Sequence, residues 1–98
     1  MARLQAKSLE SPDEVRPTPF GRVDIYNLDD LVIGRMTFQP GWHWAEHVQP
    51  IAGTPLCQYH HVGVCIQGSQ GIRMEDGSTI IIRAGAVFDI PPGHDGWV

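Results

Sequence analysis

Short runs of β-type residues alternate with turn-forming residues along most of the chain. Residues 23–26 and 31–38 are rich in branched and aromatic side chains, and the turn-prone segment 27–30 between them predicts a hairpin. Later runs of the same kind are bounded by glycines and cover residues 62–67, 72–75, 79–83 and 87–90. Many short strands without a long helical period predict an all-β sandwich or barrel.

The dipeptide Asp76-Gly77 gives the strongest local signal, which is for a second hairpin. It stands between two strand-like runs, and we expect a two-residue type I′ turn in which both central residues have positive φ. Ile72 and Met74 alternate with charged residues, so one face of their strand should point inward. The run Ile80-Ile81-Ile82 breaks this alternation. At least one of these isoleucines is therefore expected outside the barrel, where an oligomer interface would cover it.

The first twenty residues are polar and contain prolines. Ser11-Pro12-Asp13-Glu14 has the form of an N-cap, a proline at the first helical position and a capping-box glutamate, and Pro17 would end the helix. We therefore expect an N-terminal arm with one short helical turn over residues 1–20 and a barrel domain over residues 21–98. Two placements of the arm stay open, one on its own domain and one across a neighbouring subunit.

Composition restricts the partners. The chain has 98 residues, enough for one domain, and its 42% hydrophobic and 18% charged residues are typical of a folded protein. A net charge of −4 and a pI near 5.6 provide no basic face for phosphates, which argues against a nucleic-acid partner. No apolar run approaches the roughly 20 residues that cross a bilayer, and the first ten residues lack the apolar region of a signal peptide. We expect a cytoplasmic protein without a membrane partner.

Histidines and cysteines gather around one long loop. Residues 41–60 carry three histidines together with Pro50, Gly53 and Pro55, and loops of this length are often functional. Cys65 lies in an apolar run and is expected to be a buried small hydrophobe, whereas Cys57 lies in the loop near the histidines and a functional role for it stays open. Both thiols are expected to be reduced.

The spacing of glycines, prolines and histidines resembles the two motifs of the cupins. The first cupin motif is G, five residues, HxH, three or four residues, E, six residues, G. With Gly41 as the first glycine, His47 takes the place of the first histidine and Gln49 that of the second. Counting back six residues from Gly68, His61 takes the place of the glutamate, after an insertion that lengthens the loop.

The second cupin motif is G, five residues, P, x, G, two residues, H. Gly85, Pro91 and Gly93 match it, but its histidine position falls on Gly96, and the nearest imidazole is that of His94. The resemblance covers residues 20–98 and implies a small antiparallel β-barrel, or jelly roll, of the cupin type. The sequence stops at Val98 directly after this motif, so two explanations stay open: a barrel that lacks its last strands and pairs its open edge with a second subunit, or a C-terminal truncation.

The resemblance also implies that the ligands of the two motifs meet at one mouth of the barrel. His47, His61 and His94, with Gln49 on the same side as His47, would then hold a divalent transition metal: Zn, Fe, Ni, Mn or Cu. In the alternative interpretation these histidines only line the mouth with polar groups. Asp95 would either orient His94 or cap a turn.

Two functions follow from these interpretations. In the first, a cytoplasmic homodimeric cupin binds a divalent metal and a small organic molecule, on which it acts as a metal-dependent enzyme or which it senses. In the second, a regulatory module binds a small molecule without metal. His43 and His60 are expected to be exposed loop residues, and Trp42, Trp44 and Trp97 to fill the core or an interface.

Overall fold

The computed structural model describes residues 3–98 and is built mainly from strands. Strands account for 48% of the chain and helices for 8%, so the predicted all-β class is confirmed. The chain forms two compact units, one up to Gln39 and one from Pro40 to Val98. Over residues 3–98 the strands form three small antiparallel sheets and no closed barrel, so the expected barrel closure is not seen.

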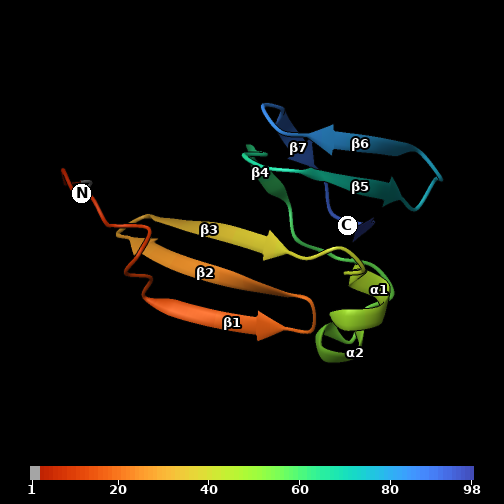
Figure 1. Cartoon of the computed structure of the whole chain (residues 1–98), viewed down its shortest axis with the longest axis horizontal. Helices are drawn as coiled ribbons and strands as arrows, with labels where there is room; N and C mark the ends of the chain where they lie inside the picture. Colours follow the sequence, from red (N-terminus) through yellow and green to blue (C-terminus); the bar gives the residue numbers. More distant parts are fainter. Residues whose placement is uncertain (1–2) are drawn as a thin grey trace. The chain divides into compact units, whose positions relative to one another are not determined.

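Unit 1, which ends at Gln39, is a meander of three strands (Figure 1). Its strands are β1 (Glu14–Thr18), β2 (Gly21–Leu28) and β3 (Leu31–Phe38), and β2 lies in the centre. The last pair of the β2–β3 ladder joins Leu28 to Leu31, so Asp29 and Asp30 make the turn. The hairpin predicted for residues 23–38 is therefore confirmed.

The helical turn expected near residue 11 is wrong. Residues 14–18 form strand β1, which pairs with β2 from Glu14 opposite Ile25 to Thr18 opposite Gly21. The carboxylate of Asp13 accepts hydrogen bonds from the backbone of Asn27 and from Lys7. A ladder supplies a backbone partner to every second residue, which outweighs one capping box. Strand β1 belongs to the compact unit that ends at Gln39.

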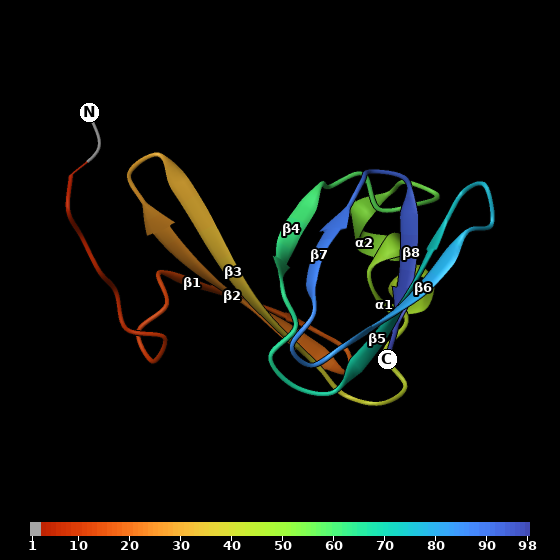
Figure 2. The same cartoon turned by 90° about the horizontal axis from the view of Figure 1, so that it is seen from above.

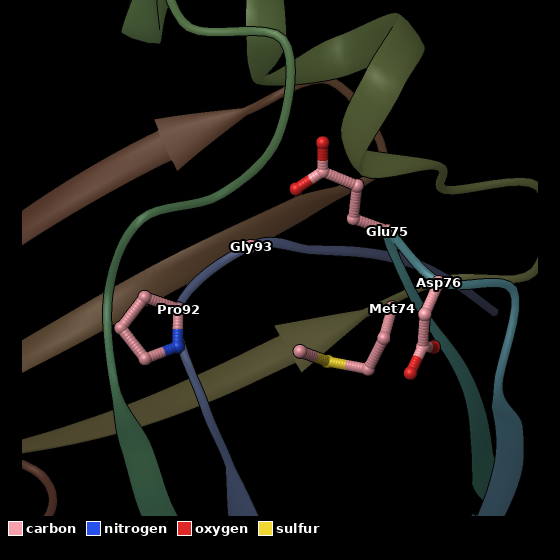
Figure 3. Close-up of a pocket in the computed structure, with 5 residues that line it drawn as sticks. All are labelled: Met74, Glu75, Asp76, Pro92 and Gly93. Atoms are coloured by element: carbon pink, nitrogen blue, oxygen red, sulfur yellow. The ribbon is translucent and has the colours of Figure 1, made fainter.

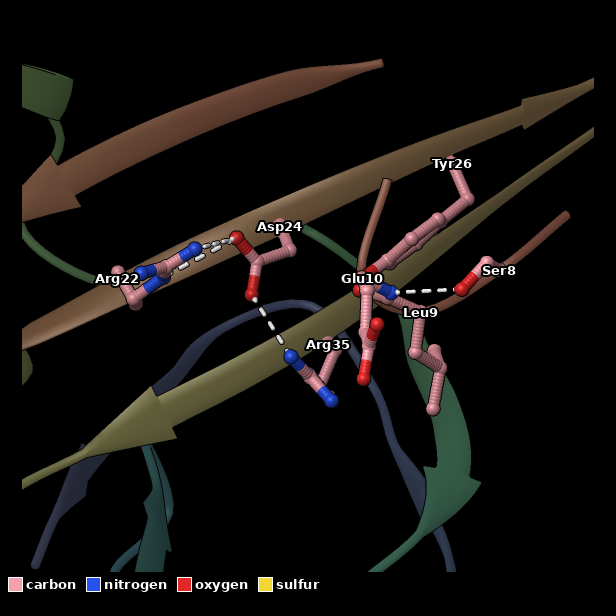
Figure 4. A network of polar contacts seen from close by, with 7 residues as sticks. All are labelled: Ser8, Leu9, Glu10, Arg22, Asp24, Tyr26 and Arg35. Atoms are coloured by element: carbon pink, nitrogen blue, oxygen red, sulfur yellow. Dashed lines mark hydrogen bonds and ion pairs between the residues drawn. The ribbon is translucent and has the colours of Figure 1, made fainter. Parts of the chain in front are cut away.

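A buried charge lies on the sheet of unit 1 (Figure 4). The Asp24 side chain is 1% exposed, and its Oδ1 accepts hydrogen bonds from the guanidinium of Arg22. Its Oδ2 lies 3.6 Å from Nη2 of Arg35. Tyr26, the next residue on the same face, donates its hydroxyl proton to the carbonyl of Leu9 at 2.5 Å and so fastens the N-terminal segment to the sheet.

Unit 2 contains two short helices followed by five strands. The helices are α1 (Trp44–His47) and α2 (Gln49–Ala52), and the strands are β4 (His61–Val64), β5 (Ser69–Met74), β6 (Thr79–Arg83), β7 (Val87–Ile90) and β8 (His94–Trp97). β4 pairs with β7 in one sheet, and β5 lies between β6 and β8 in the other (Figure 2). The loop expected over residues 41–60 is thus partly helical.

The hairpin predicted at Asp76-Gly77 is present, but its turn differs. Met74 exchanges backbone hydrogen bonds with Ser78 and Gly77, which leaves a three-residue loop from Glu75 to Gly77. Gly77 has φ 90°, whereas Asp76 is not among the described residues with positive φ. A type I turn closed by a left-handed glycine needs only one such residue, so the same dipeptide serves both turn types.

The core of unit 2 is small. It consists of Ile72, Ile82 and Ile90, against which Cys65, Ala86 and Phe88 pack. Ile80 and Ile81 are 53% and 50% exposed. Two isoleucines of the run 80–82 are therefore exposed, although no closed barrel is present for them to lie outside. Among residues 3–98, no helix has the length and apolar character that a membrane span requires.

Candidate metal centre

A backbone bridge brings the end of the long loop to strand β8. Cys57 forms an isolated antiparallel bridge with His94. The Cys57 amide donates to the His94 carbonyl at 2.8 Å, and the Gly93 amide donates to the Cys57 carbonyl at 2.7 Å. These bonds fix the thiol beside the first residue of β8. His61, the first residue of β4, completes the group.

The side chains of Cys57, His61 and His94 converge. One ligand atom from each of the three residues lies within 4.8 Å of the other two. Sγ of Cys57 lies 3.7 Å from Nε2 of His61, and the two imidazole rings are 5.2 Å apart in an edge-to-face arrangement. Cys57 is 6% exposed and His94 4%, so two of the three groups are shielded from water.

The orientation of the His94 ring is fixed by the backbone. Its Nδ1 lies 2.7 Å from the carbonyl oxygen of Pro91. Because a carbonyl can only accept, Nδ1 carries the proton, and the lone pair of the ring is on Nε2. Metal-bound histidines are commonly held by such a hydrogen bond from the other ring nitrogen.

Burial favours the uncharged forms of His61 and Cys57. It lowers the pKa of His61 below its ordinary 6.5, and nearby His94 and His60 lower it further. Burial also raises the pKa of the Cys57 thiol above its ordinary 9.0, against a smaller opposite effect of a backbone hydrogen bond from Tyr59. A neutral imidazole is ready to bind a cation, whereas the thiol must give up its proton to the solvent when it does so.

One sulfur and two nitrogens suit a particular class of ion. Zn²⁺, Co²⁺ and copper accept thiolate and imidazole together, whereas Mn²⁺ prefers carboxylate and carbonyl oxygens. The cluster contains no carboxylate among the described residues. Three protein ligands leave a fourth tetrahedral position for water or a small molecule.

The structure brings together only part of the predicted ligand set. His61 and His94 meet as expected, but His47 and Gln49 do not belong to the cluster. His47 ends helix α1, and its Nδ1 accepts a hydrogen bond from the His43 amide at 3.1 Å. Gln49 begins α2. The expectation that these two residues share one side depended on a strand, and residues two apart on a helix do not face the same way.

Cys57 is the member of the cluster that the motif comparison missed. Its counterpart His94 is far away in the chain, and only the bridge between them places the thiol in the cluster. The signal available in the sequence was the spacing Cys57-x-x-x-His61 next to a loop already rich in histidine.

Asp95 has a different partner from the one expected. Its Oδ2 lies 2.7 Å from Nε2 of His43, and its Oδ1 accepts from the amides of Ala45 and Gly96. Asp95 therefore fastens α1 to β8 and does not orient His94. His43 is half-buried in this pair, contrary to expectation, whereas His60 is exposed as predicted and pairs with Asp89.

Two hollows adjoin the strands that carry the imidazoles. The larger, about 370 Å³, is lined by Met74, Glu75, Asp76, Pro92 and Gly93 (Figure 3). The smaller, about 120 Å³, is lined by Ile72, Met74, Ser78, Ile80, Asp89, Ile90 and Pro91. In the ladders Met74 lies opposite His94 and Ile90 lies opposite His61, so each hollow is lined by a residue that pairs with a histidine of the cluster, although no residue of the cluster lines either hollow.

A scan against protein-family models, a search of curated proteins and a search of solved structures each find no match.

Proposed function

We propose that residues 40–98 form a cytoplasmic metal-binding module of the cupin type, which holds a divalent transition metal at Cys57, His61 and His94. The observation that carries this proposal is the convergence of one sulfur and two ring nitrogens within 4.8 Å. The hydrogen bond from Nδ1 of His94 and the lowered pKa of His61 support it, because both favour a ring nitrogen with a lone pair for the ion.

The module binds a small organic molecule beside the ion. Met74 lines both hollows and faces the same side of its sheet as His94. A donor atom of such a molecule would take the fourth coordination position of the ion. The ion would polarise a bound carbonyl or acidify a bound water. The cluster thus supplies what a metal-dependent enzyme needs, and it also suits a sensor that reports the bound molecule.

The charge of the lining favours neutral or cationic molecules. The two hollows are lined by Glu75, Asp76 and Asp89 and by no basic side chain. A divalent ion bound to one thiolate keeps one net positive charge. The three carboxylates together carry more negative charge than this. Carboxylate or phosphate ligands would therefore be repelled.

We also propose that the protein is a homodimer. In unit 2 the exposed fractions are 70% for Val62, 54% for Val64 and 81% for Val87, and these side chains lie on the small β4–β7 sheet. Apolar side chains gathered on one small sheet favour burial against a second copy. Light scattering at micromolar concentration is expected to give twice the mass of the chain, and a monomer would refute the dimer.

Metal analysis with matched variants tests the metal site. We expect protein purified without a metal-affinity tag to contain about one equivalent of metal. Reconstitution with Co²⁺ should give the near-ultraviolet absorption of a thiolate–cobalt bond. Cys57→Ser should abolish that absorption, and His61→Ala and His94→Ala should lower metal content and affinity by about 10-fold or more.

Two control variants sharpen the test. His47→Ala changes a residue of the cupin-like motif that lies outside the cluster, and His60→Ala changes an exposed neighbour of His61. Both should keep the metal and the cobalt spectrum. Metal only at trace level in the unaltered protein would sink the metal site and favour a small-molecule module without metal.

A further inference from the structure

The two sheets of unit 2 pack against one another through a small apolar core. Cys65 and Ala86 extend the β4–β7 ladder beyond Val64 and Val87, and the Cys65 amide donates to the Ala86 carbonyl at 2.9 Å. Both side chains pack on the core isoleucines, two of which, Ile72 and Ile82, belong to the other sheet. Apolar packing therefore secures this end of the β4–β7 sheet.

The other end of the β4–β7 sheet carries the metal cluster. The ladder ends with His61 opposite Ile90. His94 begins β8, which belongs to the β6–β5–β8 sheet, and Cys57 is bridged to the same strand. The three ligands thus come from both sheets and from the loop that leads into β4.

The β4–β7 sheet needs such a support. It has two strands of four residues each, and an isolated two-stranded sheet is marginally stable in water. The fully buried core of unit 2 amounts to three isoleucines besides the tryptophans of the loop. Small domains with little core commonly gain stability from a metal.

We infer that the bound ion is zinc and that it is a structural cross-link, which holds the β4–β7 sheet to the β6–β5–β8 sheet at the end where His61 pairs with Ile90. This inference rests on the proposed metal site and adds the role of the ion in the fold. The sulfur and nitrogen ligands select zinc over iron and manganese, and zinc joins such ligands in a tetrahedral arrangement without redox chemistry. A ligand from each sheet makes the ion a cross-link between them.

Amide hydrogen exchange of the unaltered protein with and without Zn²⁺ tests the inference. With free zinc at about 100 times its Kd, exchange through opening of the β4–β7 sheet should slow by about 100-fold, because the ion binds only the closed form. Amides of the β5–β6 hairpin should slow much less, since that hairpin is closed by its own turn. Mg²⁺, which prefers oxygen ligands, should have no effect.

The outcomes separate the inference from the proposed function. If zinc binds stoichiometrically and β4–β7 exchange is unchanged, the structural role is overturned and the metal site stands. If no metal binds, both fall. Iron in place of zinc in the purified protein would overturn the identity of the ion. His60→Ala should keep the zinc-dependent protection, and Cys57→Ser should lose it. If Cys57→Ser does not fold even with zinc, the comparison of the unaltered protein with and without zinc decides whether the ion is structural.

Discussion

The two units of this protein bury polar groups in opposite ways. In unit 1 the Asp24 carboxylate, 1% exposed, is neutralised by Arg22 and Arg35. In unit 2 the buried His94 meets His61 and Cys57, and no opposite charge belongs to that cluster among the described residues. Because two arginines offset the charge of Asp24, its burial has a structural explanation. A thiol and two imidazoles gathered without an opposite charge are the better candidate for function.

Side-chain packing differs between the units as well. The β3 strand of unit 1 exposes Leu31, Val32 and Ile33 at 63%, 65% and 48%. In unit 2, by contrast, a glycine of β5 lies directly against an aromatic ring of β8. Substitutions that add the same atoms should therefore have opposite effects in the two units.

Adding a methyl group to a strand glycine should give the largest effect. A Cβ at Gly71 would lie 2.2 Å from Cε2 of Trp97, so Gly71→Ala must displace the indole and should destabilise the protein by about 3 kcal/mol. A Cβ at Gly34 would meet Val23 at 3.8 Å, an ordinary contact. Gly34→Ala should instead stabilise by about 0.5 kcal/mol, because alanine loses less backbone entropy. Urea unfolding of both variants measures the difference, and equal effects would refute the packing contrast.

Removing a guanidinium from unit 1 should give an intermediate effect. Arg22→Met leaves the buried Asp24 with Arg35 alone, and we expect a measurable loss of stability, smaller than for a fully buried pair because Arg22 is 51% exposed. Arg16→Met is the matched control, since Arg16 pairs with Glu14 on the surface and should change stability by about 0.5 kcal/mol or less. A loss for Arg22→Met no larger than that of the control would show that Asp24 does not depend on the pair.

Changing the pH should give the smallest effect and should act on the cluster of unit 2. In the metal-free protein burial lowers the pKa of His61 below 6.5, so the unfolded chain binds the proton first as the pH falls. The folded state should lose stability as the pH drops below 6.5. The raised pKa of Cys57 should remove stability as the pH rises above 9.0, because the unfolded chain releases that proton first.

Unfolding midpoints across this pH range check the assignment. His61→Gln should flatten the acid limb and Cys57→Ser the alkaline limb. His60→Gln, a change at the exposed neighbour, should leave most of the acid limb in place. An acid limb that persists undiminished in His61→Gln would assign it to other groups.

The sequence predicts the local features of this fold well. The hairpins at residues 23–38 and 72–83 are pairings of neighbours, and the turn residues between them act over a few positions. Strand β1 was missed because its residues carry helix-capping signals and gain their partners only from β2. The helices α1 and α2 were missed because each has four residues, too few for a helical period. Gly53, left-handed at the end of α2, was the one local sign.

The candidate site was predictable in part for the same reason. His61 and His94 begin strands that the glycine and proline pattern located nearly correctly, so their meeting follows from the order of strands. Cys57 depends on a bridge across 37 positions of sequence, and no local pattern predicts such a bridge. His47 and Gln49 were chosen by counting residues along a strand that the chain does not form.

Strand β8 anchors both ends of the segment that precedes β4. Asp95 binds Ala45 at one end and His94 bridges to Cys57 at the other. The intervening residues form a closed loop whose two ends are attached to adjacent residues of strand β8, as in compact surface loops. The length of this loop can therefore vary without moving either attachment point, since a longer loop adds little to the entropy cost of closure. Residues 50–53 are accordingly the natural place to insert a reporter peptide into this protein.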